Sequence, residues 1–457
     1  MEFIVLAIFV VGYLFIALEH TFHIDKAASA LLTGTLCWGL FVIGVHEVPG
    51  HLAEDFASFQ AHFTGDASLA LHTFFEHRLL HHMEDISSIL FFLLGAMTIV
   101  ELVDAHEGFA VITDRIKTSD KVRLLWILAI LTFFFSAVLD NLTTSIVMVS
   151  LLRKLIDDKE TRWMFAGVVV IAANAGGAWS PIGDITTTML WIGNQLTADV
   201  IVTNLIVPSI ACLLVPLGIL SFTMKGDVKR PETALHKVDP TSAGERNLVF
   251  IMGVAGLLFV PVFKTVTHLP PFMGMMLSLG VMWVITEIIH RSKNHEERSH
   301  LSVIGVLRKI DAASVLFFLG ILLAVAALQE IGHLINAASW LRDSMGNVYA
   351  INVTIGFLSA IVDNVPLVAA SMGMYDVTAV GAAASEWEGY FVQNGVFWQF
   401  LAYCAGTGGS ALIIGSAAGV AVMGLERIDF VWYLKKISLL AISGYLAGAV
   451  VFWLMFR

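Results

Sequence analysis

The chain has 457 residues, of which 57% are hydrophobic and 14% charged, and its formal net charge is -11. Soluble globular proteins carry about 25% charged residues, so this composition excludes a soluble domain and indicates a polytopic membrane protein. Three cysteines lie far apart in apolar sequence without CxxC spacing, which excludes a disulfide framework and a cysteine metal site.

Apolar runs of about 20 residues, the length that crosses a bilayer, recur along the chain. Two of these runs are too long for simple spans, and each contains a polar, glycine-rich stretch, at 174–184 and at 405–410. Unwound backbone at membrane depth is tolerated only where protein or a water-filled cavity covers it, so we expect two discontinuous helices. The predicted spans are 2–18, 27–45, 87–104, 162–195, 199–222, 246–262, 270–290, 312–330, 391–424 and 431–455.

An Asp-Asn pair interrupts each of two further apolar segments, at Asp140-Asn141 and, about half the chain later, at Asp363-Asn364. An ionisable residue inside an apolar segment is costly and is by default a functional candidate. Both segments are longer than one span and shorter than two, so a re-entrant hairpin fits each place better than one tilted helix. We expect an inner hairpin at 122–154 and an outer hairpin at 344–375.

The distribution of basic residues favours this topology. With ten spans and two hairpins, all but four of the 26 Lys and Arg residues fall on one side of the membrane, as the positive-inside rule requires. Turning either hairpin alone into a span would place every later loop on the wrong side. We therefore expect a multi-pass protein of the cell (inner) membrane with both termini on the outer (periplasmic) side. The four exceptions are Arg78, Lys264, Arg342 and Arg457.

Residues 1–222 and 246–457 repeat the same order of elements: three spans, a hairpin, a discontinuous helix and a final span. Five full spans is an odd number, so the two halves insert with opposite orientation, and 223–245 becomes a cytoplasmic linker. The predicted fold class is therefore an all-α polytopic membrane protein built as an inverted repeat. In such folds the binding site lies near the bilayer midplane, where the halves meet.

The two hairpin tips and the two helix breaks are expected to converge at that site. Their polar side chains carry oxygen and amide groups but no Lys, Arg, His or Cys, and hard cations prefer such oxygen ligands. Of the set, Asp140, Asn141, Asn174, Asp184 and Thr186 are the expected Na⁺ ligands. The predicted cation- and proton-binding residues are Asp140, Asn141, Thr143, Thr144, Asn174, Ser180, Asp184, Thr186, Thr187, Ser359, Asp363, Asn364, Thr407 and Ser410.

Carboxylates at this depth can couple a cation to a proton. Desolvation disfavours the charged form, so one carboxylate binds either H⁺ or Na⁺, and alternating exposure to the two sides exchanges them. Asp140 and Asp184 are the predicted exchanging pair, whereas Asp363 either titrates or caps the outer hairpin. No cofactor, no catalytic residue and no nucleic-acid partner is expected, and the chain is not expected to be an enzyme.

The predicted outer loop at 46–86 is rich in histidine. The run from His46 to His51 resembles a zinc-protease motif, but three residues instead of two separate Glu47 from His51, and Pro49-Gly50 forbids the helix that the motif needs. A protease is therefore excluded, whereas a pH-sensing role for this loop stays open. Its histidines are His46, His51, His62, His72, His77, His81 and His82.

At the motifs 140–144, 174–177, 180–187 and 363–366 the chain resembles the ion transporter superfamily, and within it the NhaD-type sodium/proton antiporters. The resemblance covers nearly the whole chain. It implies exchange of Na⁺ or Li⁺ for H⁺ by a homodimer, with a scaffold part and an elevator-like transport part. The residues that it implicates are Asp140, Asn141, Asn174, Asp184, Thr186, Thr187, Ser359, Asp363 and Ser410.

An anion carrier of the same superfamily is the alternative, either an arsenite or other oxyanion exporter or a sodium-coupled dicarboxylate symporter. Dicarboxylate relatives carry uncharged hairpin tips, unlike the Asp-Asn pairs here, but oxyanion exporters share those pairs. A membrane-embedded enzyme would need a nucleophile, metal triad or cofactor motif, and a channel would need rings of like charge; the sequence shows none of these.

Overall fold

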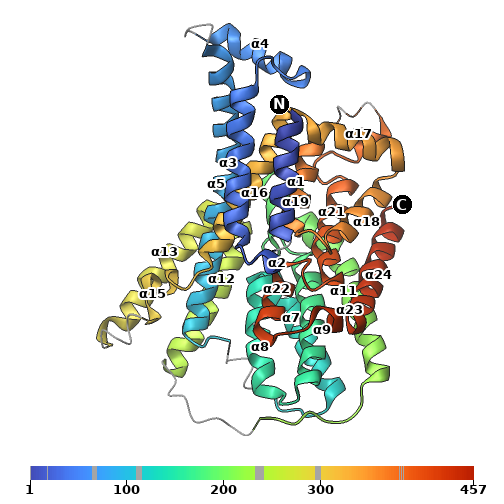
Figure 1. Ribbon diagram of the computed structural model, residues 1–457. Helices are drawn as coiled ribbons and strands as arrows, with labels where there is room; N and C mark the ends of the chain where they lie inside the picture. The colour runs from blue at the N-terminus through green and yellow to red at the C-terminus, as the bar shows by residue number, and fades with distance from the viewer. Residues whose placement is uncertain are drawn as a thin grey trace. The chain divides into compact units, whose positions relative to one another are not determined.

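In the computed structural model the chain folds almost entirely into helices (Figure 1). The structure describes residues 2–17, 19–63, 69–109, 116–231, 241–293, 300–379, 381, 383 and 385–457. Part of the predicted linker, residues 232–240, lies outside the described residues. The all-helical class predicted from the sequence is confirmed.

The chain forms two compact units. The first consists of residues 1–90, 311–347 and 365–377, and the second of 91–310, 348–364 and 378–457. Each unit takes segments from both predicted halves of the sequence, so the units are not the two repeats. Every residue predicted to bind the cation or the proton belongs to the second unit.

The first unit contains α1 (Glu2–Ala17), α2 (Glu19–Phe22), α3 (Lys26–Gly44), η1 (Gly50–Leu52), α4 (Ala53–His62), α16 (Ala312–Ile331) and α17 (His333–Met345). Two helices pass from one unit to the other, α5 (Ala70–Ala105) and α19 (Asn364–Met374). The second unit contains α7 (Lys121–Leu139), α8 (Asn141–Leu155), α9 (Lys159–Gly177), α10 (Ile185–Ile192), α11 (Ala198–Thr223), α12 (Ala243–Thr267), α13 (Pro271–Ile289), η3 (His290–Ser292), α15 (Val303–Leu307), α18 (Val348–Leu358), α20 (Glu386–Gly389), α21 (Val396–Gly408), η4 (Gly409–Ala411), α22 (Ala417–Glu426), α23 (Phe430–Lys436) and α24 (Ser438–Phe456).

Eight helices of the described chain are long and apolar enough to cross a membrane, which agrees with a polytopic protein. They include α7, the first arm of the predicted inner hairpin, which has 19 residues. The others are α3, α5, α11, α12, α13, α16 and α24.

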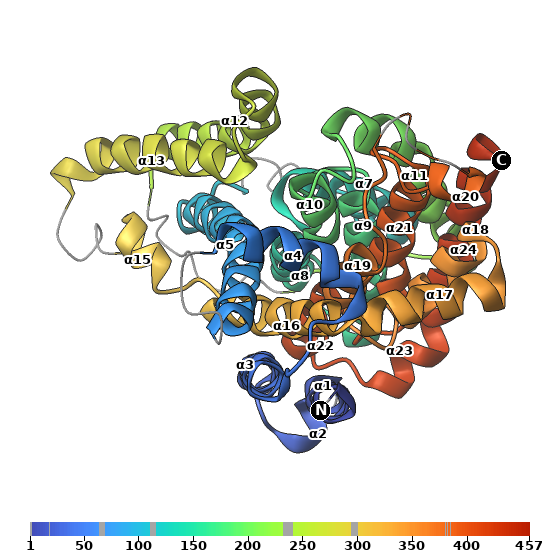
Figure 2. The same ribbon diagram turned by 90° about the horizontal axis from the view of Figure 1, so that it is seen from above.

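Close helix contacts hold the first unit together. Helix α3 packs against both α1 and α16 (Figure 2). At the α3–α16 contact a Cβ atom added to Gly34 would lie 2.4 Å from the carbonyl oxygen of Gly320, so only glycine allows this approach. The indole Nε1 of Trp38 donates to the carbonyl oxygen of Leu323 at 2.8 Å. Small residues that bring backbones together are typical of membrane helix packing.

The structure differs from the sequence interpretation in the region predicted as an outer loop, because α5 begins at Ala70 and residues 70–86 are helical. This early start has two causes in packing. Phe75 is buried, with its ring 4.8 Å from that of Phe41. Arg78 Nη2 and His82 Nε2 each lie 2.7 Å from Oε1 of the buried Glu330. Tertiary contacts thus extend the helix beyond the apolar run.

In the second unit, α7 and α8 form a hairpin whose tip is Asp140, with φ 80° and ψ 159°. The start of α7 and the end of α8, the ends away from the tip, lie close together. Both are hydrogen-bonded to the short segment 226–229. The backbone N–H of Lys121 donates to Gly226 at 3.0 Å, and that of Asp157 donates to Lys229 at 2.9 Å. Helices α7, α8 and α9 lie side by side (Figure 1). The two ends of the segment that carries the first Asp-Asn pair at its tip therefore lie close together.

Two helices of this unit are interrupted. The stretch 178–184 separates α9 from α10, and we name it the first break. The stretch 409–416, with the short η4, separates α21 from α22, and we name it the second break. Interruption leaves backbone groups without helical partners, and the side chains that serve these groups build the site described below.

Glycines let each interrupted helix touch a neighbouring helix through backbone atoms. A Cβ added to Gly176 would lie 2.1 Å from the carbonyl oxygen of Phe133, on the first hairpin arm α7. A Cβ added to Gly408 would lie 2.0 Å from the carbonyl oxygen of Gly356, on α18. The two interrupted helices therefore pack in the same way against the helix that leads to an Asp-Asn tip.

A buried carboxylate at the end of α22 forms ion pairs with α8 and α9. Glu426 is 5% exposed, and Arg153 Nε and Arg162 Nε donate to its two carboxylate oxygens at 2.6 and 2.7 Å. The indole of Trp163 donates to the backbone oxygen of Glu426 at 3.0 Å. Because each oxygen has its own partner, the buried charge is compensated.

A second buried pair joins the C-terminal ends of α5 and α13. His106 Nε2 lies 2.7 Å from His290 Nε2, and His106 Nδ1 lies 2.6 Å from the carbonyl oxygen of Leu102. A carbonyl only accepts, so Nδ1 of His106 carries the proton and His290 donates between the rings. Burial lowers the pKa of His290 to about 4, with His106 and Lys293 lowering it further, so the pair is neutral near pH 7.

Candidate functional site

Asp184 ends the first break and caps α10. Its side chain is buried, with 1% exposed. Oδ1 accepts hydrogen bonds from the backbone N–H of Thr186 at 2.8 Å and from the Thr186 hydroxyl at 2.7 Å. A side-chain oxygen that accepts from the second or third residue is the usual N-cap arrangement, and a carboxylate there is favoured by the helix dipole.

Asn141, at the first hairpin tip, connects Asp184 to the other side of the break. Its Nδ2 donates to Asp184 Oδ2 at 2.6 Å and to Asn174 Oδ1 at 3.1 Å. Asn174 lies on α9 before the break and is fully buried. The first tip and both ends of the first break therefore meet in one hydrogen-bonded group.

Residues of the second half complete this group. Asn174 Nδ2 donates to Ser410 Oγ at 2.9 Å and to Ser416 Oγ at 3.0 Å, both in the second break. Asn364 Nδ2, at the second tip, lies 3.5 Å from Asp184 Oδ1. Both tips and both breaks thus converge within the second unit. We name this group the polar cluster: Asn141, Asn174, Asp184, Thr186, Asn364, Ser410 and Ser416.

Asp140 lies beside the polar cluster and caps α8. Its two carboxylate oxygens accept from the backbone N–H and from the hydroxyl of Thr143, both at 2.8 Å. Its side chain has no hydrogen bond to the polar cluster among the described residues, but its charge and that of Asp363 both repel Asp184. Three carboxylates therefore share one region, and a bound cation would relieve their repulsion.

Four of the remaining predicted residues are buried and donate hydrogen bonds to backbone carbonyls. Ser180 donates to the carbonyl of Ala137, and Ser359 donates to that of Ala405. Thr187 donates to backbone oxygens of the first break, and Thr407 donates to a carbonyl of its own helix. Thr144 is buried, and its hydroxyl has no partner in the described part of the chain.

Ser416 is the cluster residue that the sequence interpretation missed. It caps α22, and its Oγ accepts from the backbone N–H of Gly419 at 3.2 Å as well as from Asn174. Aligning the two breaks residue by residue from their glycines places Ser416 opposite Asp184. That alignment was the available signal, but a lone serine in an apolar, glycine-rich stretch carries no mark of its own.

The chemistry of the polar cluster suits a cation. Its hydrogen-bonding groups are carboxylate, amide and hydroxyl, and no basic side chain donates to it among the residues that the structure describes. The same part of the chain contains no group of three His, Cys, Asp or Glu side chains placed to hold a metal ion. The site therefore offers mainly neutral oxygen ligands around a single fully buried carboxylate.

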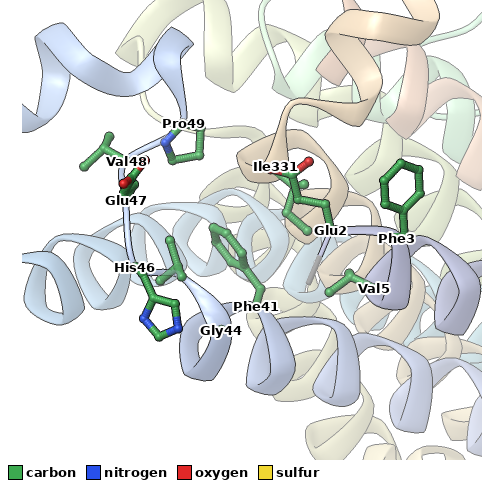
Figure 3. A pocket seen from close by; sticks show the side chains of 11 residues that line it. Glu2, Phe3, Val5, Phe41, Gly44, His46, Glu47, Val48, Pro49 and Ile331 are labelled. Carbon is green, nitrogen blue, oxygen red and sulfur yellow. The ribbon is translucent and has the colours of Figure 1, made fainter.

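The first unit has a separate pocket of about 490 Å³ beside the histidine-rich segment. His46 and Glu47 lie on one side of it and Glu2 on the other (Figure 3). The two acidic groups and the histidine do not converge on one point, so this pocket is not a candidate metal site. The polar cluster remains the candidate functional site.

Comparisons with known proteins agree with these features. A family model described as citrate transporter (CitMHS) matches residues 13–391. The chain is 46% identical over 445 residues to "Sodium/proton antiporter 1" of Arabidopsis thaliana, covering 97% of this chain and 71% of that protein. It is 30% identical over 481 residues to the "Na(+)/H(+) antiporter NhaD" of Alkalimonas amylolytica, covering 99% and 90%.

Among solved structures, the YdaH transporter of Alcanivorax borkumensis matches with a TM-score of 0.56 and 12% identity, covering 93% of this chain and 98% of that one. This likeness concerns the fold. The resemblance to NhaD-type antiporters found in the sequence motifs is confirmed by relatives of that name over nearly the full chain. The chain belongs to the CitMHS family of membrane transport proteins.

Proposed function

We propose that this protein is a secondary active transporter that exchanges Na⁺ or Li⁺ for H⁺ and so contributes to sodium and pH homeostasis. The polar cluster is the observation that carries the proposal, because it joins both tips and both breaks around the buried carboxylate of Asp184. Relatives named sodium/proton antiporter, at 30–46% identity, support it.

The atoms available to a cation can be named. Asn141 donates through Nδ2 in both of its hydrogen bonds to the polar cluster, which leaves its carbonyl oxygen for a ligand role. The buried hydroxyl of Thr144 on the next turn of α8 is a second oxygen. With the carboxylates of Asp184 and Asp140 they form the oxygen set that Na⁺ prefers. Asn174 and Thr186 hold Asp184 and Asn141 in place.

Exchange follows from competition at the carboxylates. An ionised carboxylate binds the cation, and a protonated one does not, so each release of Na⁺ allows H⁺ to bind. Interrupted helices at membrane depth are the elements around which such transporters alternate their access. Asp140 and Asp184 are the proposed exchanging pair, and Asp363 either joins them or serves the second tip alone.

An anion substrate is the second candidate, because the matching family is described as citrate transporter. Helix N-termini bind anions, and α8 and α10 both begin at this site. Their N-termini, however, are already capped by the carboxylates of Asp140 and Asp184. A citrate or oxyanion would therefore meet like charge in place of free N–H groups, which favours the cation.

The proposed assembly is a homodimer in the cell (inner) membrane, with both termini on the outer side. The positive-inside distribution of Lys and Arg supports the orientation. Apolar side chains exposed on α1 and α3, among them Phe3 at 82% and Leu32 at 64% exposure, support contact with lipid or with a second subunit.

Everted membrane vesicles that hold a pH gradient test the proposed function. Addition of Na⁺ or Li⁺ should dissipate the gradient, and Asp140→Asn and Asp184→Asn should abolish that response. Asp158→Asn is the matched control, because Asp158 caps α9 through Thr161 at an exposed position, and asparagine caps a helix as well as aspartate. Citrate uptake by vesicles that do not respond to Na⁺ or Li⁺ would overturn the proposal.

A further inference from the structure

The two breaks have nearly the same backbone. A Cβ added to Gly177 would lie 2.4 Å from the carbonyl oxygen of Gly183, and one added to Gly409 would lie 2.5 Å from that of Gly415. The next residue in each break is an extended N-cap, Asp184 with φ -146° and ψ 144°, and Ser416 with φ -147° and ψ 152°. Ser416 thus occupies in the second break the place of Asp184 in the first.

Ser416 touches the polar cluster directly. Its Oγ lies 3.0 Å from Asn174 Nδ2, and the side chain is 1% exposed. The other Nδ2 hydrogen of Asn174 goes to Ser410 Oγ at 2.9 Å. Both hydrogens of this amide are therefore bound by hydroxyls of the second break, and its carbonyl Oδ1 is turned to Asn141.

We propose that Ser416 is a positioning residue that holds the Asn174 carbonyl toward Asn141 and thereby sets the cation affinity of the site. The inference rests on the function proposed above. Without the Ser416 hydroxyl one buried N–H of Asn174 has no acceptor, and leaving a buried donor unsatisfied is costly. The amide is then held on that side by Ser410 alone, and its carbonyl oxygen is oriented less firmly toward Asn141.

Ser416 also caps α22 through Gly419, so a purely structural role must be separated from positioning. Glycine is nearly as good an N-cap as serine, whereas alanine is poor. Ser416→Gly therefore keeps the cap and removes the hydroxyl, and Ser416→Thr keeps both. Ser242→Ala removes a capping serine at the start of α12, where no cluster residue is involved, and serves as the matched control.

The experiment measures the Na⁺ concentration that gives half-maximal dissipation of the pH gradient, and the maximal response, in everted vesicles with equal amounts of folded protein. Ser416→Ala and Ser416→Gly should both raise the half-maximal concentration about tenfold and largely keep the maximal response. Ser416→Thr should return it to within about twofold of the original value, and Ser242→Ala should leave it unchanged.

Three results would overturn the inference: an unchanged half-maximal concentration in Ser416→Gly, an effect of Ser416→Ala on the maximal response alone, or a failure of threonine to restore affinity. If the unmodified protein does not dissipate the gradient with Na⁺ or Li⁺, it is the proposed function that fails. The glycine variant keeps the test valid where the alanine variant folds poorly.

Discussion

The first and second breaks share a backbone and differ in chemistry. In both, a glycine pair permits a carbonyl contact across the break, and an extended residue then caps the following helix. The first break and its flanking helices carry Asn174, Asp184 and Thr186. At the same spacing from its glycines, the second break with its flanking helices has Gly406, Ser416 and Ala418.

The comparison separates the residues that interrupt each helix from the residues that supply the chemistry of the site. The close glycine contacts build an interruption of the helix in both halves, whereas charge is present in the first break alone. The second break contributes hydroxyls that bind the Asn174 amide. One half therefore supplies the buried carboxylate, and the other half orients the amide next to it.

The backbone part of the comparison predicts the largest effect. Gly176→Ala would place a Cβ 2.1 Å from the carbonyl oxygen of Phe133, and Gly408→Ala would place one 2.0 Å from that of Gly356. Overpacking costs about 1–3 kcal/mol even when side chains can shift, and backbone shifts less easily, so both variants should lose most of their folded yield in detergent.

Gly424→Ala on α22 is the matched control, because no atom lies within 4 Å of the added Cβ. It should keep the yield and the melting temperature, since alanine favours helix. A large loss in only one of the two break variants would show that the breaks do not share their packing.

Exchanging the capping residues tests the chemical part of the comparison. Asp184→Ser should lower antiport at least about 100-fold, because it removes the fully buried carboxylate that Asn141 and Thr186 bind. The double variant Asp184→Ser with Ser416→Asp should stay inactive, since α22 after the second break has Ala418 where a threonine like Thr186 would be needed. Recovery of a tenth of the antiport rate or more in vesicles would mean that the two breaks are interchangeable.

The two hairpin tips provide a smaller contrast. Asn141 makes two hydrogen bonds to the polar cluster, at 2.6 and 3.1 Å, whereas Asn364 makes one contact, at 3.5 Å. Asn141→Ala should therefore raise the half-maximal Na⁺ concentration at least about tenfold, and Asn364→Ala less than about threefold. Equal effects in the same vesicle assay would show that the tips contribute symmetrically.

The sequence predicted the fold class, because hydropathy, glycine-rich interruptions and basic residues report on membrane insertion directly. It also indicated which segments carry the candidate site, since buried carboxylates and amides are rare in apolar runs. The structure places Asn141, Asn174 and Asp184 in contact, as the proposed site requires.

The direction of the shorter side chains could not be predicted. A hydroxyl in an apolar helix binds either a ligand or a nearby carbonyl, and in the structure Thr187 and Thr407 bind backbone carbonyls. Ser416 was missed for the same reason, because its role depends on an amide that is distant in the sequence. Helix α5 starts before the apolar run because Phe75 packs against Phe41 and Arg78 pairs with Glu330. Such contacts join residues from different helices, so the local sequence does not reveal them.

The last prediction concerns the Thr186 hydroxyl of the first half, because the second half has Ala418 at the corresponding position. Thr186→Val keeps the shape of the side chain and removes the 2.7 Å hydrogen bond to Asp184, while the backbone N–H of the same residue still donates at 2.8 Å. The half-maximal Na⁺ concentration should therefore rise only about three- to tenfold, and Thr186→Ser should restore it. Thr188→Val is the matched control, because the Thr188 hydroxyl binds backbone carbonyls alone. If Thr188→Val weakens Na⁺ affinity as much as Thr186→Val, the loss reflects a loosened α10 and not the missing bond to the carboxylate.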